Sequence, residues 1–222
     1  MLRTDIDTVL AEVLSDRRLL DHSFYRRWVA GTLERDELTA YSAQYRRFEA
    51  ALPVVLEAIT RGLDDPTARQ LVQANLDDER SVPAPHLSLF DDFARALGAD
   101  LDAPPTPATE ALVGLYATLA RTTPLGALAA VAAYEVQAPA VAASKAEGLR
   151  ARYGLDATAT RFWDVHAGVD ELHGEWIVDA LAASATDIDE VRNAAAAAAE
   201  AWWAFLDERD AARAGAPASA AC

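Results

Sequence analysis

The residues best suited to chemistry lie in one stretch near the C-terminal end, where His166, Asp170 and His173 recur as H-x3-D-x2-H. On a helix of 3.6 residues per turn, Asp170 lies roughly 40° and His173 roughly 20° from the direction of His166, so the three side chains share one face. Apolar residues interleave with them, namely Phe162, Val165, Val169, Leu172 and Trp176. This pattern predicts a face that points into the protein. Buried imidazoles and carboxylates need a partner, and a metal ion is the simplest one; taken alone, surface or hydrogen-bonded core histidines explain the pattern equally well.

Three further residues extend these donors to a larger candidate set. His86 follows Glu79 by seven residues, about two turns, which would set both on one face of a continuous helix, although Pro83 and Pro85 interrupt the pattern. Glu135 lies within an apolar stretch, where a carboxylate is costly unless it is paired or binds a cation. Mixed nitrogen and oxygen donors inside a helical bundle are typical of di-iron and iron–manganese sites, whereas zinc alone needs fewer ligands. The predicted metal ligands are Glu79, His86, Glu135, His166, Asp170 and His173.

Lysine is almost absent from the chain. Of the 20 basic residues, 19 are arginine and the one exception is Lys145. A GC-biased genome produces such a composition without any functional cause, and chance is therefore one explanation of the single lysine. The other is chemical, because lysine can lose its proton in a protein and arginine cannot. Lys145 is accordingly a candidate functional residue.

Composition limits the class of protein. Its 222 residues are 52% hydrophobic but only 8% aromatic, with dense alanine, which predicts one all-α domain at residues 1–213 and a disordered tail at 214–222. The net charge of -15 disfavours binding to nucleic acid or to an anionic membrane. A single cysteine, Cys222, and a charged N-terminal segment without a secretory pattern predict a cytoplasmic location.

The hydrophobic periodicity predicts a bundle of about seven to nine helices. The expected segments are residues 4–19, 22–30, 34–62, 67–81, 86–97, 109–122, 125–153, 157–183 and 188–212. Residues 99–107, rich in Asp and Pro, are expected to be a loop rather than a domain boundary, because candidate ligands fall on both sides of them. The stretch from Pro124 to Ser144 is apolar enough for a membrane span, but its Glu135, Gln137 and Pro139 favour a buried central helix.

Several of these residues together resemble a known group of proteins. The first part, which resembles the opening of haem-oxygenase-like helical proteins around TenA, PqqC and the CADD proteins, comprises His22 to Trp28, Gly31, Leu38, Tyr41 and Gln44-Tyr45. The second part resembles the ordered pattern of the CADD-like dimetal oxidases and comprises Asn75 to Glu79, His86, Tyr134 to Pro139, Lys145, Gly148-Leu149, Tyr153, His166, Asp170 and His173. The resemblance spans roughly residues 20–180 and implies a single-domain haem-oxygenase-like helical bundle.

The resemblance also implies a metal centre and its chemistry. Glu79, His86 and Glu135 would bind one metal, with Glu135 able to bridge, while the H-x3-D-x2-H residues would bind the other. Two transition-metal ions, Fe/Fe or Fe/Mn, would activate O2 as co-substrate with an external reductant. CADD-type proteins form para-aminobenzoate from a tyrosine of their own chain, for folate metabolism.

By the same resemblance, Lys145 takes the place of the amine donor. Tyr25 and Tyr41 take the places of the sacrificed or radical-carrying tyrosines. Ordinary core packing, with the hydroxyl hydrogen-bonded, is the alternative for each tyrosine. A lysine beside cations should have a lowered pKa, which would favour the neutral, nucleophilic amine.

Two alternatives remain open from the sequence. A multiple-turnover oxygenase acting on an external amino acid, amine or fatty acid would need a pocket open to solvent. A non-catalytic helical interaction module would instead use the acidic surface and an exposed Trp202-Trp203 pair, and these tryptophans with the alanine face would also suit a homodimer.

Overall fold

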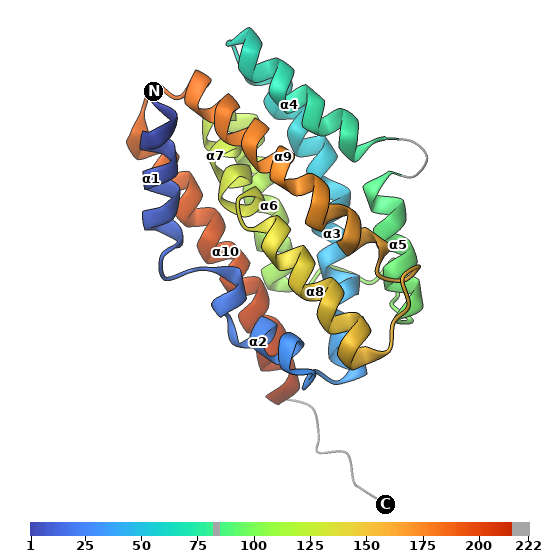
Figure 1. Ribbon diagram of the computed structural model, residues 1–222. Helices are drawn as coiled ribbons and strands as arrows, with labels where there is room; N and C mark the ends of the chain where they lie inside the picture. Colours follow the sequence, from blue (N-terminus) through green and yellow to red (C-terminus); the bar gives the residue numbers. More distant parts are fainter. Residues whose placement is uncertain (82–84, 215–222) are drawn as a thin grey trace, which may run out of the picture.

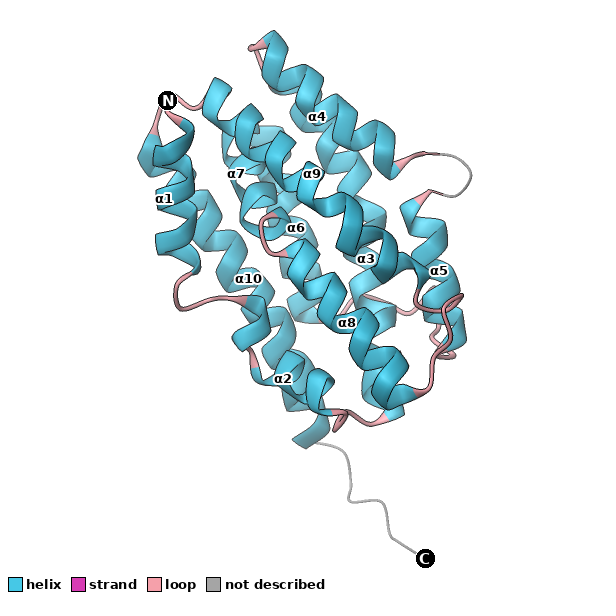
Figure 2. Cartoon of the chain, viewed as in Figure 1, coloured by secondary structure: helices cyan, strands magenta, loops and turns pink. Residues whose placement is uncertain are grey.

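The computed structural model describes residues 1–81 and 85–214, without the side chains of residues 169–171 and 214. The described residues form helices and no strand (Figures 1 and 2). Ten are α-helices and one is a short 3-10 helix: α1 (Arg3–Leu14), η1 (Leu19–Asp21), α2 (Ser23–Ala30), α3 (Arg35–Gly62), α4 (Pro66–Glu79), α5 (His86–Ala96), α6 (Pro107–Thr122), α7 (Pro124–Glu135), α8 (Ala138–Tyr153), α9 (Arg161–Ser184) and α10 (Ile188–Ala214). The all-α prediction is confirmed, and the ten α-helices are one more than the upper end of the predicted seven to nine.

Helix α7 lies in the centre of the bundle. Every residue from Gly126 to Glu135 is buried, and the helix packs against α10, α9 and α6. Its alanines allow this close approach because they leave little side chain between neighbouring helices. The stretch Pro124–Tyr153 is long and apolar enough to cross a membrane, but 72% of its most apolar window is buried inside the fold. The apolar sequence is thus explained by central packing.

The prediction of a single helix over residues 125–153 is wrong, because the helix is interrupted between α7 and α8. Helix α7 ends at Glu135 and α8 starts at Ala138, with Pro139 in its first turn. Proline has no backbone N–H and its ring clashes with the preceding turn, so it suits the start of a new helix. The Gln137 side chain closes the break by accepting from the Leu19 N–H at 2.9 Å and donating to the Ala133 carbonyl at 3.0 Å.

The Asp- and Pro-rich segment 99–107 is a loop held against the bundle, as predicted. Gln44 on α3 donates to the Pro104 carbonyl at 3.0 Å and accepts from the Thr106 N–H at 2.9 Å. The Ala108 N–H at the start of α6 donates to Glu208 on α10 at 3.2 Å. The loop therefore packs between helices on both sides of it in the sequence.

The expectation that the Trp202 side chain is exposed is wrong. Its side chain is 2% exposed and stacks on Tyr134 with a ring-centroid distance of 4.7 Å. The Trp202 indole N–H donates to the Tyr116 hydroxyl at 3.1 Å. Trp203 is partly buried and packs edge-on against His22 at 4.8 Å. The large apolar rings belong to the core of the bundle, because α10 packs directly on α7.

Candidate metal centre

Three of the predicted ligands converge from three helices. Glu79 ends α4, His86 starts α5 and His166 lies on α9, and all three side chains are buried. Each offers a ligand atom, and these atoms lie within 4.8 Å of one another. Glu79 Oε1 is 3.2 Å from His86 Nδ1. The two-turn spacing on one helix is not the reason, because α4 and α5 are separate helices, yet they bring both donors to one place.

His173 lies about two turns further along α9 than His166 and belongs to the same group. It is fully buried, and its Nδ1 is 3.8 Å from Glu79 Oε1. Its ring centroid is 6.0 Å from that of His86, and the His86 and His166 centroids are 4.5 Å apart. The side chain of Asp170 lies outside the described residues. The shared face predicted for His166 and His173 is thus observed, turned towards α4 and α5.

Hydrogen bonds orient two of these imidazoles. His166 Nδ1 lies 2.8 Å from the Phe162 carbonyl, which can only accept, so Nδ1 carries the proton and the Nε2 lone pair is left for a metal. His173 Nε2 lies 2.8 Å from the Asp78 carboxylate, which holds the opposite tautomer. Asp78 also lies 3.8 Å from His86 Nε2. The sequence prediction missed Asp78, although it directly precedes a predicted ligand.

The electrostatics of the cluster suit metal binding. Burial alone would raise the Glu79 pKa, but hydrogen bonding and attraction to His86 outweigh it and lower that pKa. Burial lowers the His166 pKa to about 4 and lowers the His173 pKa, so both imidazoles are neutral near pH 7. A charged carboxylate beside neutral imidazoles is the donor chemistry that iron and manganese accept. The residues present therefore fit a transition-metal site.

Glu135 lies at the end of α7 and is 2% exposed. Burial raises its pKa well above the usual range, and the charges of Glu79 and Glu49 raise it further. The carboxylates of α3, α4 and α7 thus act on one another inside the bundle. A cation among them would offset this repulsion.

Glu49 is the second residue that the sequence prediction missed. It lies on α3 and is 3% exposed, and burial followed by repulsion from Glu79 raises its pKa to about 8. The signal was present in the sequence, because Glu49 interrupts the apolar face of the helix between Tyr45 and Leu52. It is the same kind of signal that singled out Glu135.

Lys145, Tyr41 and Tyr25 form a second buried group. Lys145 Nζ donates to the Tyr41 hydroxyl at 2.6 Å, and the Tyr41 and Tyr25 hydroxyls are 2.8 Å apart. Lys145 is 2% exposed, and both tyrosines are buried. Burial raises the pKa of each tyrosine, so both are neutral phenols. The three predicted catalytic side chains are therefore in direct contact.

Burial lowers the Lys145 pKa well below its usual range, and the charge of Glu49 only partly opposes this. Aromatic rings surround the Nζ atom, with the Trp163 centroid at 4.0 Å and the Tyr45 centroid at 4.5 Å. Ring faces attract a desolvated ammonium by about 2 kcal/mol. Removing the charge from water costs several kcal/mol, so the neutral amine is favoured.

The two groups adjoin one another. Trp163, whose ring contacts Lys145, precedes His166 by three residues on α9 and so lies on the neighbouring turn. The hydroxyls of Tyr45 and Tyr134 are hydrogen-bonded to each other, and Tyr134 directly precedes the candidate ligand at the end of α7. The amine and the metal donors thus lie in adjoining parts of the bundle interior.

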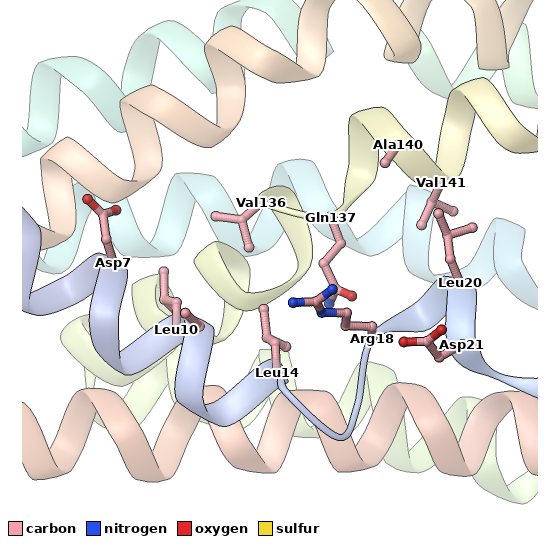
Figure 3. Close-up of a pocket in the computed structure, with 11 residues that line it drawn as sticks. Asp7, Leu10, Leu14, Arg18, Leu20, Asp21, Val136, Gln137, Ala140 and Val141 are labelled. Carbon is pink, nitrogen blue, oxygen red and sulfur yellow. The ribbon is translucent and has the colours of Figure 1, made fainter.

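The surface pockets lie to one side of this interior. A groove of about 510 Å³ runs between α1, η1 and the α7–α8 junction, and its lining contains none of the predicted ligands. Figure 3 shows Leu10 and Leu14 lining it from α1 and Gln137 lining it from the α7–α8 junction. A smaller pocket of about 280 Å³ includes Glu135 in its lining.

Comparison with known proteins gives the family. Residues 39–206 match the family model described as iron-containing redox enzyme. A 4-aminobenzoate synthase of Nitrosomonas europaea is 36% identical over 213 residues, covering 88% of this chain and 87% of that protein. A 4-aminobenzoate synthase of Chlamydia trachomatis is 30% identical over 204 residues, with 88% and 87% covered.

Solved structures agree on the fold. A TenA homologue from Pseudomonas syringae has a TM-score of 0.77 at 15% identity, with 93% of each chain covered. A CADD-like protein from Nostoc punctiforme has a TM-score of 0.73 at 19% identity, covering 95% of this chain and 97% of that one. With its fold, its buried donors and a family match over most of its length, the chain belongs to the haem-oxygenase-like iron-containing redox enzymes.

Proposed function

We propose that this protein is a 4-aminobenzoate (para-aminobenzoate) synthase of the CADD type, which forms its product from one of its own tyrosines. The names of its relatives support the product. The observation that carries the proposal is the buried contact of Lys145 with Tyr41, and of Tyr41 with Tyr25, beside the metal donors. A nitrogen donor and two candidate phenols are already held together without an external molecule.

The six predicted residues would hold two transition-metal ions, Fe/Fe or Fe/Mn: Glu79, His86, Glu135, His166, Asp170 and His173. When bound, these metals supply the activation of O2, with electrons from an external reductant. The chain prepares the site for them: the Phe162 carbonyl and Asp78 fix the tautomers of His166 and His173.

The remaining side chains would prepare the reacting groups. Burial keeps Lys145 as a neutral amine, whose lone pair makes it a nucleophile. Its hydrogen bond to Tyr41 fixes the amine against the phenol, and Tyr25 holds the other side of that hydroxyl. The surrounding rings of Trp28, Trp163 and Tyr45 exclude water, which protects reactive species from side reactions.

Growth of a para-aminobenzoate auxotroph tests this function. Expression of the chain with iron and manganese supplied should restore growth, and Lys145→Met, Tyr25→Phe and Tyr41→Phe should each reduce or abolish it. Tyr153→Phe is the matched control, because Tyr153 contacts backbone atoms of α2 and the following turn and lies outside the group. Failure of the metal-loaded wild-type chain to restore growth would contradict the proposal.

One observation favours a second candidate, an oxygenase acting on an external small molecule. Glu135 belongs to the lining of the pocket of about 280 Å³, so an external molecule bound there would lie beside a candidate ligand. This candidate predicts more than one product molecule per chain under excess O2 and reductant. A yield that stops at or below one per chain would eliminate it.

A further inference from the structure

We propose that Glu49 is an additional carboxylate ligand of the metal centre, on the side of Glu79 and His86. The inference rests on the proposed dimetal function, and adds to it a donor from α3, a helix that supplies none of the six predicted ligands.

The position of Glu49 follows from the stripe to which it belongs. Tyr41, Tyr45 and Glu49 are spaced by four residues, so they lie one above another on one face of α3. All three are buried, and the Tyr41 and Tyr45 rings stack with centroids 5.3 Å apart. Lys145 contacts the first residue of the stripe. Glu49 therefore lies at the end of the stripe that is farther from Lys145, on the side of the metal donors.

The neighbouring helices place the donors around that end of the stripe. The Tyr45 hydroxyl is hydrogen-bonded to the Tyr134 hydroxyl, so the end of α7, with Glu135, lies alongside this face of α3. Helix α3 also packs against α4 and α5, which carry Glu79 and His86. Those two residues exert the strongest charge interactions on Glu49. Glu49 thus lies on a helix that packs against the three helices carrying these donors.

The Glu49 carboxylate has a hydrogen-bond partner in Tyr45, but within the described part of the chain it has no cationic partner that would offset its burial. Among residues 1–81 and 85–214 it forms no ion pair with a lysine, arginine or histidine. Lys145, whose positive charge would attract Glu49, is favoured as the neutral amine. A buried carboxylate in this setting costs several kcal/mol unless a cation binds beside it. A structural acid would be replaceable by leucine, whereas a metal ligand would not.

Charge and donor type both agree with this role. Glu49, Glu79, Glu135 and Asp170 carry four negative charges when ionised, which match the four positive charges of two divalent ions. One metal ion would then be bound by the carboxylates of Glu49, Glu79 and Glu135 and by one imidazole, that of His86. Most of its ligand atoms would be oxygen. Oxygen-rich positions suit manganese better than nitrogen-rich ones. Glu49 therefore favours manganese at the position next to Glu79.

Metal binding to purified variants tests the proposal. Metal-free protein is titrated with Mn(II) and Fe(II), and bound metal is measured by elemental analysis. The wild-type chain should bind two ions, and Glu49→Gln should weaken one of them, chiefly manganese, by about tenfold or more, since losing even an outer-shell partner costs 10–100-fold. Glu57→Gln makes the same change on the same helix, at a surface glutamate paired with Arg80, and should bind like wild type.

The outcomes separate this inference from the proposed function. A wild-type chain that binds no transition metal would overturn both. A wild-type chain that binds two ions, with Glu49→Gln binding both unchanged, would overturn the role of Glu49 alone. Glu49→Asp guards against misfolding of the glutamine variant: it keeps the charge but shortens the reach by one methylene, and should weaken the same ion. Unchanged binding by the aspartate variant, together with a manganese anomalous peak remote from its carboxylate, would likewise overturn the role.

Discussion

The buried amine of Lys145 has a measurable consequence for stability. Its pKa is lower in the folded chain than in the unfolded one, so at pH 7 folding must remove a proton, and this cost fades as the pH rises towards the usual value of 10.5. Lys145→Met has no such cost. We expect it to raise the midpoint of thermal unfolding of the metal-free protein by about 2 to 8 °C at pH 7, from a gain of about 1 to 2 kcal/mol, and by less at pH 10.

Lys145→Arg is the matched control, because arginine stays charged. It should lower the unfolding midpoint at both pH values. Thermal unfolding followed by circular dichroism gives all three midpoints. Equal effects of Lys145→Met at pH 7 and pH 10 would mean that Lys145 is charged in the folded protein.

Some of the site residues could be predicted from the sequence alone, and others could not. Lys145 stood out by composition, and His166 and His173 by spacing, since a helix repeats its faces whatever it packs against. Glu49 and Asp78 were missed for different reasons. Glu49 interrupts the apolar face of a long helix, and this signal could have identified it. The contact of Asp78 with His173 joins residues 95 positions apart, which no local pattern reports.

At the scale of helices, the amine group depends on the close approach of α2 to α8. A Cβ atom added to Gly148 would lie 2.8 Å from the Trp28 ring, whose indole N–H donates to the Lys145 carbonyl at 3.3 Å. Gly148→Ala should therefore push the two helices apart and lower stability by about 1 to 3 kcal/mol. Differential scanning calorimetry should show a fall in the unfolding midpoint of about 2 to 12 °C.

Gly114→Ala is the control for helix propensity. Gly114 lies within α6 and an added Cβ would meet nothing within 4 Å. Alanine there should stabilise the protein by up to about 1 kcal/mol. If both substitutions stabilise the protein, then α2 and α8 tolerate the extra methyl group and the contact is looser than described.

Helix positions followed from periodicity, but their ends and breaks did not. Residues 34–62 were predicted within one residue of α3, which continues through Pro53. The break at Val136 and Gln137 was missed although Pro139 marks it, because the mostly apolar residues on both sides continue the helical pattern across it. Whether such a run breaks depends on partners such as Leu19, which lie far away in the sequence.

At the scale of the molecule, the donors come from helices spread across the chain, so metal binding should stabilise the whole bundle. An ion present at about 1,000 times its dissociation constant adds about 4 kcal/mol. We expect Mn(II) or Fe(II) to raise the unfolding midpoint of chelator-treated protein by about 8 to 16 °C. Burial lowers the pKa of His86, but hydrogen bonding and attraction to Glu79 outweigh it and raise that pKa above the usual 6.5. Protons therefore compete with the metal, and the shift should shrink as the pH falls through this raised pKa.

Calcium at the same concentration is the control, because it prefers oxygen ligands and gains little from imidazoles. It should shift the midpoint much less than manganese does. Equal shifts from calcium and manganese would indicate general screening of the acidic surface rather than a site with histidine ligands.

The most direct test of the account is to label the chain and follow the label. Protein produced with ring-¹³C tyrosine and ¹⁵N-ε lysine is purified, loaded with iron and manganese, and exposed to O2 with a reductant in unlabelled buffer. Mass spectrometry should find 4-aminobenzoate with a labelled ring and labelled nitrogen, at no more than one molecule per chain. Unlabelled product, or labelled product from a Lys145→Met chain, would contradict the origin proposed for it.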